Sequence, residues 1–428
     1  MGPAEISLAY VFWERSNTLD EAQRQKSPWR RNLAILWGCT FVAGIAFSEI
    51  MPFMSLYVGE LGDFSKAQVS FYSGLVYAAT FLVTAIVSPM WGALADKKGR
   101  KIMLIRAAFG MAVAMFCMGL VTNVWELIAL RALQGLFSGY ISNAQALIAS
   151  QTPRSNAGKA LGTLVTGSTS GMLMGPIIGG ALAQFFSIRD TFFITAGLLL
   201  LTGIMSAFFV KEDFVPIPAR PKAAKQKGLL RGLLSQFANP KLIIVLLFST
   251  LFVQLGNASI APIVSLYVKE LMHGKGAFAL VAGIIAALPG ISNIIAAPRL
   301  GEYGDRHGSG KVLVAGYLFA VLVYIPQGFV PGVITLGILR LLVGISDGAL
   351  FPTIQTLLTK NSPVTATSAI FSWNQSFQAL GNMFGALLGG TLAGIFNYNV
   401  VFIATACLLL INFLMLWFTE PQLRTGKA

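Results

Sequence analysis

Four charged side chains lie deep inside long apolar runs of the sequence, where a charge is costly unless it pairs or faces water. They are Glu49, Arg131, Arg340 and Asp347. A carboxylate taken out of water favours its protonated form, and a nearby arginine favours the ionised form. An acid that alternates between these surroundings can bind and release a proton, so we predict that Asp347 and Glu49 are proton-coupling residues. The alternative is that each acid only neutralises an arginine.

The depths of these charges indicate how they can pair. At 1.5 Å per residue, Glu49 lies about 12 Å below the outer end of its helix, and Arg131 lies at about the same depth in another helix. These two side chains can therefore meet. Arg340 and Asp347 are seven residues apart, so they share one helix face at about 10 Å along the axis.

Other polar side chains on the apolar runs are candidates for lining a substrate cavity, although each alone is more often an interhelical hydrogen bond than a ligand contact. They are Gln134, Asn143, Gln254, Asn257, Trp373, Asn374 and Gln378, beside the two arginines. The cysteines and histidines show no metal-ligand spacing, and no phosphate loop or catalytic triad is present. We therefore expect no metal, no cofactor and no enzymatic activity.

The composition indicates a polytopic membrane protein. Of the 428 residues, 55% are hydrophobic and 11% charged, against about 25% charged in soluble domains. Apolar runs of about 20 residues, the length of a membrane-spanning helix, occur twelve times, at roughly 33–57, 70–93, 102–121, 124–150, 159–186, 191–210, 242–268, 277–298, 312–330, 332–359, 365–396 and 400–418. We expect an all-α protein, monomeric in the bilayer.

Lysine and arginine are unevenly divided between alternate loops, which orients a membrane protein. With a cytoplasmic N-terminus, 25 of the 31 lie in tails and inner loops, four in outer loops and two inside spans. We therefore predict that both termini are cytoplasmic. The net charge of +14 then reports topology, and we expect no nucleic-acid partner.

The two halves of the sequence repeat at an offset of 209 or 210 residues. Residues 51–58 return as 261–268, Arg131 as Arg340, Asp96 as Asp305, and Gly179-Gly180 as Gly389-Gly390. We predict two pseudo-symmetric six-helix bundles at 29–210 and 242–420. A cytoplasmic tail at 1–28 precedes them, a linker at 211–241 joins them, and a tail at 421–428 follows. The substrate site is expected between the bundles, near the midplane.

Glycines and one proline recur through the fifth apolar run, a pattern that would break a helix in water but is tolerated in a bilayer. Three of the glycines are four residues apart on one helix face, and the proline removes a hydrogen bond and bends the helix. We expect this face to pack closely on a second helix. The pattern consists of Gly162, Gly171, Gly175, Pro176, Gly179 and Gly180.

The loop after the second apolar run reads GALADKKGRK from 92 to 101. Gly92 allows close helix packing, and Asp96 can accept hydrogen bonds at a helix end. Arg100 can pair with Asp96 or with a neighbouring helix. We predict that Gly92, Asp96, Gly99 and Arg100 form a salt-bridged clasp that acts as a conformational switch. The alternative is a solvated turn that only orients the chain.

Both patterns resemble motifs of the major facilitator superfamily. The loop is similar to its signature G-x-L-a-D-r-x-G-r-[RK], with Lys97 where arginine is usual, and the glycine run is similar to the fifth-span motif of its twelve-span drug:proton antiporters. Arg131, Gln134 and Gly135 resemble a motif of proton-coupled members. The resemblance implies export of amphiphilic small-molecule drugs, driven by inward proton flow across a bacterial cytoplasmic membrane.

Two other classes stay open. A proton-coupled or facilitative transporter of a sugar or metabolite would share the fold and the signature loop, although the glycine run argues against it. A non-transporting receptor or lipid-handling protein would need no buried ion pair.

Overall fold

The computed structural model describes residues 28–212, 239–361 and 367–419, and within these ranges the predicted all-α fold is confirmed. The N-terminal bundle consists of α2 (Trp29–Ser48), α3 (Met54–Glu60), α4 (Lys66–Lys98), α5 (Arg100–Leu120), α6 (Val124–Leu136), α7 (Tyr140–Gln151), α8 (Arg154–Phe185) and α9 (Ile188–Phe209). The C-terminal bundle consists of α11 (Pro240–Ile260), α12 (Val264–Leu271), α13 (Phe278–His307), α14 (Ser309–Gln327), α15 (Val333–Lys360), α16 (Thr367–Ile395) and α17 (Tyr398–Thr419). Both predicted tails, apart from residue 28, and most of the predicted linker lie outside the described residues.

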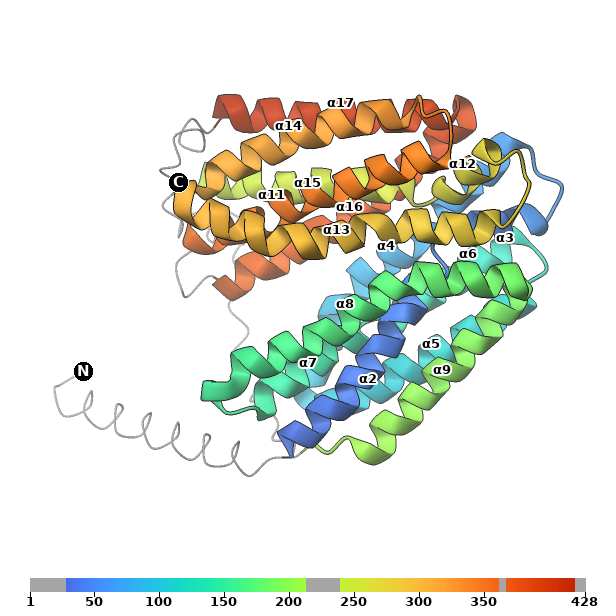
Figure 1. The fold of residues 1–428 in the computed structure, drawn as a ribbon. Helices are drawn as coiled ribbons and strands as arrows, with labels where there is room; N and C mark the ends of the chain where they lie inside the picture. Colours follow the sequence, from blue (N-terminus) through green and yellow to red (C-terminus); the bar gives the residue numbers. More distant parts are fainter. Residues whose placement is uncertain (1–27, 213–238, 362–366, 420–428) are drawn as a thin grey trace, which may run out of the picture.

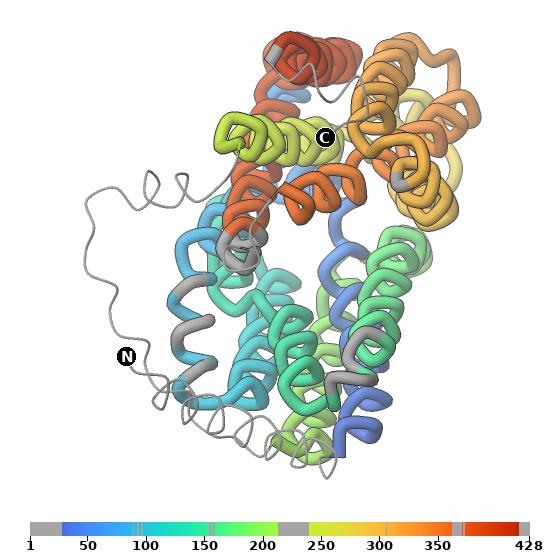
Figure 2. Tube along the Cα trace, turned by 90° about the vertical axis from the view of Figure 1, so that its left-hand side faces the viewer, coloured from blue at the N-terminus to red at the C-terminus, as the bar shows by residue number. Residues whose placement is uncertain are grey.

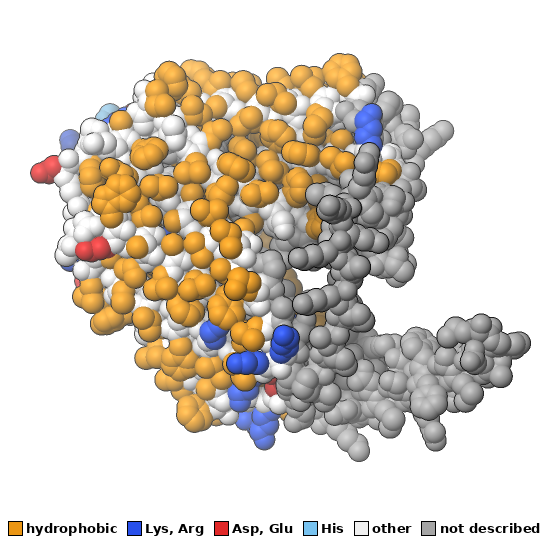
Figure 3. Space-filling model, turned by 180° about the vertical axis from the view of Figure 1, so that it is seen from behind, with side chains coloured by type: hydrophobic (Ala, Val, Ile, Leu, Met, Phe, Trp, Pro, Cys, Tyr) orange, Lys and Arg blue, Asp and Glu red, His pale blue; other side chains and the backbone are white. Residues whose placement is uncertain are grey.

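Nine helices in the described ranges are long and apolar enough to cross a membrane: α2, α4, α5, α9, α11, α13, α14, α15 and α17. The other three predicted spans coincide with α8, with α16 and with the pair α6 and α7. The count of twelve spans therefore stays a prediction. Hydrophobic side chains cover most of the face in Figure 3, with charged ones towards its edges, as a lipid-facing surface requires.

Three of the predicted spans are broken helices. Pro52 and Pro262, which are 210 residues apart, lie between a long helix and a short one in their respective bundles, and proline cannot donate the hydrogen bond that would continue the helix. The third break separates α6 from α7, where Gly139 has a φ of 102°. Only glycine adopts such a backbone without strain.

Each bundle has its own hydrophobic core, and the two appear as separate groups of helices in Figure 2. The repeat is visible in single hydrogen bonds. The Tyr57 hydroxyl donates to the carbonyl of Met118 at 2.8 Å, and the Tyr267 hydroxyl donates to the carbonyl of Gln327 at 3.2 Å. Both partners are displaced by 209 or 210 residues, so the bundles share their internal bracing as well as their topology.

Helix α8 packs on α2 through its glycine face. A Cβ added to Gly171, Gly175 or Gly179 would collide with the backbone of α2, so the predicted close packing is present. Gly162 has nothing within 4 Å of such a Cβ and lies apart from this face. The C-terminal bundle repeats the arrangement between α16 and α11, through Gly381, Gly385 and Gly389.

The bundles touch each other through the opposite sides of the same two helices. Gly180 of α8 lies against Gly283 of α13, and Gly390 of α16 lies against Gly74 of α4. The hydrogen bonds that the described residues make between the bundles are at the same end, from Ser55 to the carbonyl of Pro262 and from Lys66 to Glu270. Towards the other end, which carries both termini, the bundles diverge (Figure 1). The molecule is closed at one end.

Candidate functional site

Asp347 on α15 ends a chain of buried hydrogen bonds in the C-terminal bundle. Its side chain is 8% exposed, and both carboxylate oxygens lie 3.1 Å from the amide nitrogen of Asn257 on α11. The amide oxygen of Asn257 in turn accepts a hydrogen bond of 2.9 Å from the hydroxyl of Tyr324 on α14. Three helices therefore hold one acid in a defined position.

Arg340 lies one helical stretch away on α15 and is also 8% exposed. It interacts electrostatically with Asp347, but the two make no ion pair, although both lie in the described ranges. Its Nε and Nη1 atoms are buried without a hydrogen-bond partner. A buried donor without a partner costs free energy, so Arg340 is a charge that this conformation leaves uncompensated.

Glu49 and Arg131 do not meet, so the pairing expected from their depths is wrong. Glu49 is fully buried, and its Oε1 is hydrogen-bonded to the hydroxyl of Thr195 on α9, whereas its Oε2 has no partner. Arg131 donates to the side chain of Gln134 at 2.6 Å and lies over the ring of Tyr77, 5.8 Å from its centroid. The two helices place these side chains at similar depths but in different directions.

The equivalent place in the C-terminal bundle contains no acid. Ser259 stands where Glu49 does, and its hydroxyl is hydrogen-bonded at 2.8 Å to that of Thr405, the equivalent of Thr195. A hydroxyl is therefore enough to join these two helices, and the carboxyl group of Glu49 exceeds what the packing requires.

The other polar candidates are distributed over several environments. Asn374 accepts a hydrogen bond of 2.7 Å from Thr250, and Asn143 donates to Gly139 in the break before its own helix. The structure shows no hydrogen bond from the remaining three, which are partly buried, to any residue that it describes: Gln254, Trp373 and Gln378.

The signature loop contacts an acid that the sequence did not single out. The backbone amides of Arg100 and Lys101 donate to the two carboxylate oxygens of Glu212, at 2.8 and 2.7 Å. Glu212 follows the sixth apolar run, in the segment predicted as linker, and its position in the sequence gave no signal of this contact. The side chain of Asp96 lies outside what the structure describes, so its pairing with Arg100 stays a prediction.

Residues at the start of the predicted linker are tied to the N-terminal bundle. The carbonyl of Lys211 accepts hydrogen bonds from Asn32 on α2 and Gln151 on α7, at 2.7 and 2.9 Å. Glu212 is therefore held next to the first turn of α5, where a carboxylate also interacts favourably with the helix dipole.

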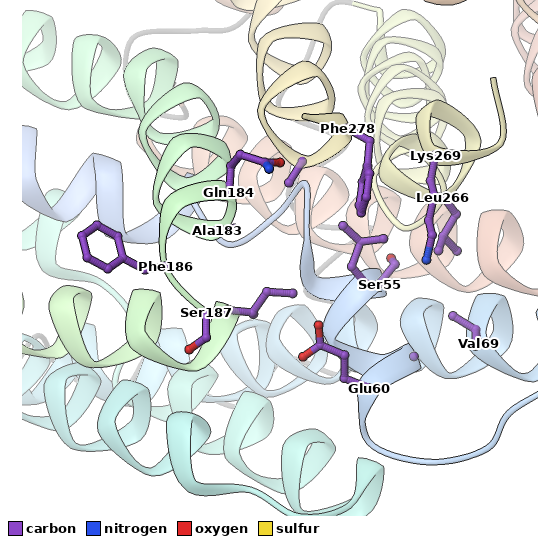
Figure 4. Close-up of a pocket in the computed structure, with 14 residues that line it drawn as sticks. Ser55, Glu60, Val69, Ala183, Gln184, Phe186, Ser187, Leu266, Lys269 and Phe278 are labelled. Atoms are coloured by element: carbon purple, nitrogen blue, oxygen red, sulfur yellow. The ribbon is translucent and has the colours of Figure 1, made fainter. Parts of the chain in front are cut away.

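A cavity of about 540 Å³ lies between the bundles at the closed end (Figure 4). Glu60 of α3, Gln184 of α8 and Lys269 of α12 are among the side chains that line it. Burial raises the pKa of Glu60, while the positive charges of Arg189 and Lys269 act in the opposite direction. The cavity contains charge of both signs, as suits a water-filled vestibule.

Residues 36–278 and 246–427 match the family model of the Major Facilitator Superfamily. The chain belongs to this superfamily. It is therefore a multi-pass membrane transporter, and its function is not that of an enzyme.

Curated relatives cover nearly all of the chain. The multidrug resistance protein MdtG of Escherichia fergusonii is 46% identical over 399 residues, which are 92% of this chain and 97% of the relative. The MdtG of Citrobacter koseri is 45% identical over 389 residues, 91% of this chain and 95% of its own.

Solved structures with the same fold are more distant in sequence. A bacterial homologue of the human lysosomal transporter Spinster, in an inward-facing and unoccupied conformation, superposes with a TM-score of 0.75 at 15% identity and covers 94% of this chain and 99% of its own. The peptide transporter POT in complex with sulfate gives 0.75 at 15% identity, with coverage of 95% and 99%. These likenesses show the fold alone.

Proposed function

We propose that this transporter exports amphiphilic drugs in exchange for protons, by alternating access across a bacterial cytoplasmic membrane. The observation that carries the proposal is the 45–46% identity, over nine-tenths of the chain, to proteins named for multidrug resistance. A sugar or metabolite transporter would share the fold, but those relatives favour drug export. The tight α8–α2 packing agrees with the antiporter motif.

The closed end of the molecule fits one state of such a cycle. If both termini are cytoplasmic, as the lysine and arginine distribution predicts, the diverging ends of the bundles face the cytoplasm. A drug would then enter from inside while the Gly180–Gly283 and Gly390–Gly74 contacts and the Lys66–Glu270 ion pair close the outer end. Rocking of the bundles about these contacts would expose the site to the outside.

Asp347 is the better supported of the two proton-coupling candidates. Its partner Asn257 lies on another helix of the same bundle, and the uncompensated Arg340 lies near it. A movement that brought Arg340 into contact would favour the ionised acid, and the opposite movement would favour the protonated acid. The same pair of groups can therefore bind a proton in one state and release it in the other.

Glu49 is the second candidate, and its hydrogen bonds indicate its protonation state. The hydroxyl of Thr195 lies within hydrogen-bond distance of both Glu49 and the carbonyl of Thr191. A hydroxyl has one proton to donate, and the carbonyl can only accept it. The remaining hydrogen bond is made if the carboxyl group of Glu49 donates, which requires it to be protonated in this conformation.

The decisive experiment is drug-induced proton movement in proteoliposomes containing the purified transporter. We expect Asp347→Asn and Glu49→Gln to weaken the coupling between drug and proton, with the larger effect from Asp347→Asn. Asp63→Asn, at an exposed outer position, is the matched control and should behave as the parent protein. A drug-binding measurement on each variant separates lost coupling from lost binding, which a stranded buried charge would cause.

If the double variant Glu49→Gln/Asp347→Asn still moves protons with drug, neither acid is the coupling site. If no drug drives proton movement in the parent protein, and cells with the gene show no altered drug resistance, the export proposal itself is wrong.

A further inference from the structure

A crevice of about 490 Å³ runs between α8 and α13, where the two bundles separate below their glycine contact. Figure 1 shows these helices side by side and diverging towards the end that carries the termini. Met172 on one edge is 40% exposed and Ile294 on the other is 46% exposed, so the crevice opens towards the surrounding lipid. Its volume lies within the range of small-molecule sites, about 300–1,000 Å³.

The crevice contains hydrogen-bonding groups that the protein does not satisfy. Thr169 and Asn293 line it, and neither makes a hydrogen bond with any residue that the structure describes. Proline has no N–H, so Pro176 and Pro298 cannot donate to the carbonyls four residues before them, which belong to Met172 and Ile294 of the same lining. In hydrocarbon, every unsatisfied polar group is costly.

The depth of these groups excludes a phospholipid headgroup as their partner. Thr169 is the sixteenth of 32 residues in α8, and Asn293 is the sixteenth of 30 in α13. Both therefore lie near the middle of a membrane-crossing helix, about 20 Å from either end at 1.5 Å per residue. A molecule that reaches them must be small enough to enter the hydrocarbon region as a whole.

The internal repeat shows that the crevice is not required by the fold. The equivalent helices of the pseudo-symmetric pair are α4 and α16, which meet through the equivalent contact between Gly74 and Gly390. There, Tyr77 stands where α13 has Ala286, and Phe81 stands where it has Gly290. The equivalent of Asn293 is Thr84, whose hydroxyl donates to the carbonyl of Gly135 at 3.2 Å. One side is filled and satisfied, and the other is small and unsatisfied.

We propose that the α8–α13 crevice binds a neutral amphiphilic small molecule from the bilayer, whose hydroxyl or N–H group donates to the free carbonyls and pairs with Thr169 and Asn293. A neutral ligand fits because the lining contains no charged side chain. Such a ligand contacts both bundles and therefore stabilises the conformation in which the crevice is open. That this ligand is also an exported substrate rests on the function proposed above, whereas the binding does not.

The test uses the full-length protein in phosphatidylcholine nanodiscs, without a proton gradient. The probes are hexadecanol and hexadecane, each with a photoreactive diazirine in the chain, and cross-linked peptides are quantified by mass spectrometry. We expect the alcohol to label segments 169–176 and 290–298 about threefold or more above the alkane, a ratio that one net hydrogen bond supplies. Equal labelling by the two probes would show that the polar groups select nothing.

Two variants locate the effect. Thr169→Val/Asn293→Leu should abolish the preference for the alcohol, and Ala286→Tyr, which copies Tyr77, should reduce labelling by both probes. The matched control is Thr163→Val, the same change on the same helix at an exposed hydroxyl that is bonded to Lys159, and it should leave labelling unchanged. Undiminished alcohol preference in the double variant would overturn the proposal. Because no transport is measured, failure of the drug-export proposal would leave this result intact.

Discussion

Replacing Gly175 by leucine should separate α8 from α2. A Cβ at this position would lie 2.9 Å from both the amide nitrogen of Glu49 and the carbonyl oxygen of Ile45, against at least 3.4 Å in ordinary contact. The helices would therefore have to move apart by about 0.5 Å for the Cβ alone, and further for the rest of the leucine. Added volume in a packed core costs about 1–3 kcal/mol. We expect a loss of this size in the free energy of unfolding.

Transport should suffer more than stability, because the opposite side of α8 forms the contact between the bundles. A displaced α8 moves Gly180 relative to Gly283, and each 1.4 kcal/mol of bias between two conformations changes their ratio tenfold. We expect drug efflux in proteoliposomes to fall by about tenfold or more.

Gly162→Leu is the matched control, since it makes the same change in the same helix and motif where nothing lies within 4 Å. Leucine favours a helix over glycine by about 0.5–1 kcal/mol, so this variant should be at least as stable as the parent protein and should transport normally. Full efflux by a correctly inserted Gly175→Leu protein, or equal damage from Gly162→Leu, would show that the glycine face is not a close interface.

Three further predictions concern the two ends of the molecule. Asp96→Asn should abolish transport while expression and drug binding stay largely intact, because the clasp is proposed to act on the conformational equilibrium; full transport would remove that hypothesis. Glu212→Gln should lower the free energy of unfolding by about 0.5–2 kcal/mol, as for other lost helix caps, and an unchanged thermal unfolding curve would show that the Arg100 and Lys101 contacts contribute nothing. Lys66→Met removes a 2.5 Å ion pair with Glu270 and a contact with the Tyr398 ring. Together these exposed contacts are worth about 1 kcal/mol, so spin-label distances across the closed end should show about fivefold more of the open form, and Lys275→Met should show no change.

The architecture followed from simple features of the sequence. Apolar runs predicted the helices, and the offset of 209 or 210 residues predicted two related bundles, because burial and close packing are dictated by residue type at each position. The same offset connects the Gly180–Gly283 contact to the Gly390–Gly74 contact, which no single motif would have revealed. The breaks within three spans were missed, since a hydrophobic run reports depth in the membrane but not the continuity of its hydrogen bonds.

Contacts of the charged side chains were less predictable. Depth along an axis can be counted from the sequence, but the direction of a side chain around that axis depends on how the helices are rotated against each other. Glu49 therefore meets Thr195 and not Arg131, and Asp347 meets Asn257 and not Arg340. Glu212 was missed for a related reason, because only the folded chain brings the end of α9 next to the start of α5.

The repeat distinguishes what the fold requires from what it tolerates. Positions that serve packing keep their contacts in both bundles, as the tyrosines that brace Met118 and Gln327 do. The unsatisfied groups described above break this symmetry. Glu49 corresponds to Ser259, and Asp347 corresponds to Ser138, so neither acid is needed to build a bundle of this shape. A buried acid is costly, and the chain has a working hydroxyl version of the first site in Ser259 and Thr405. Its retention of the acids therefore argues for a role in the transport cycle over a role in folding.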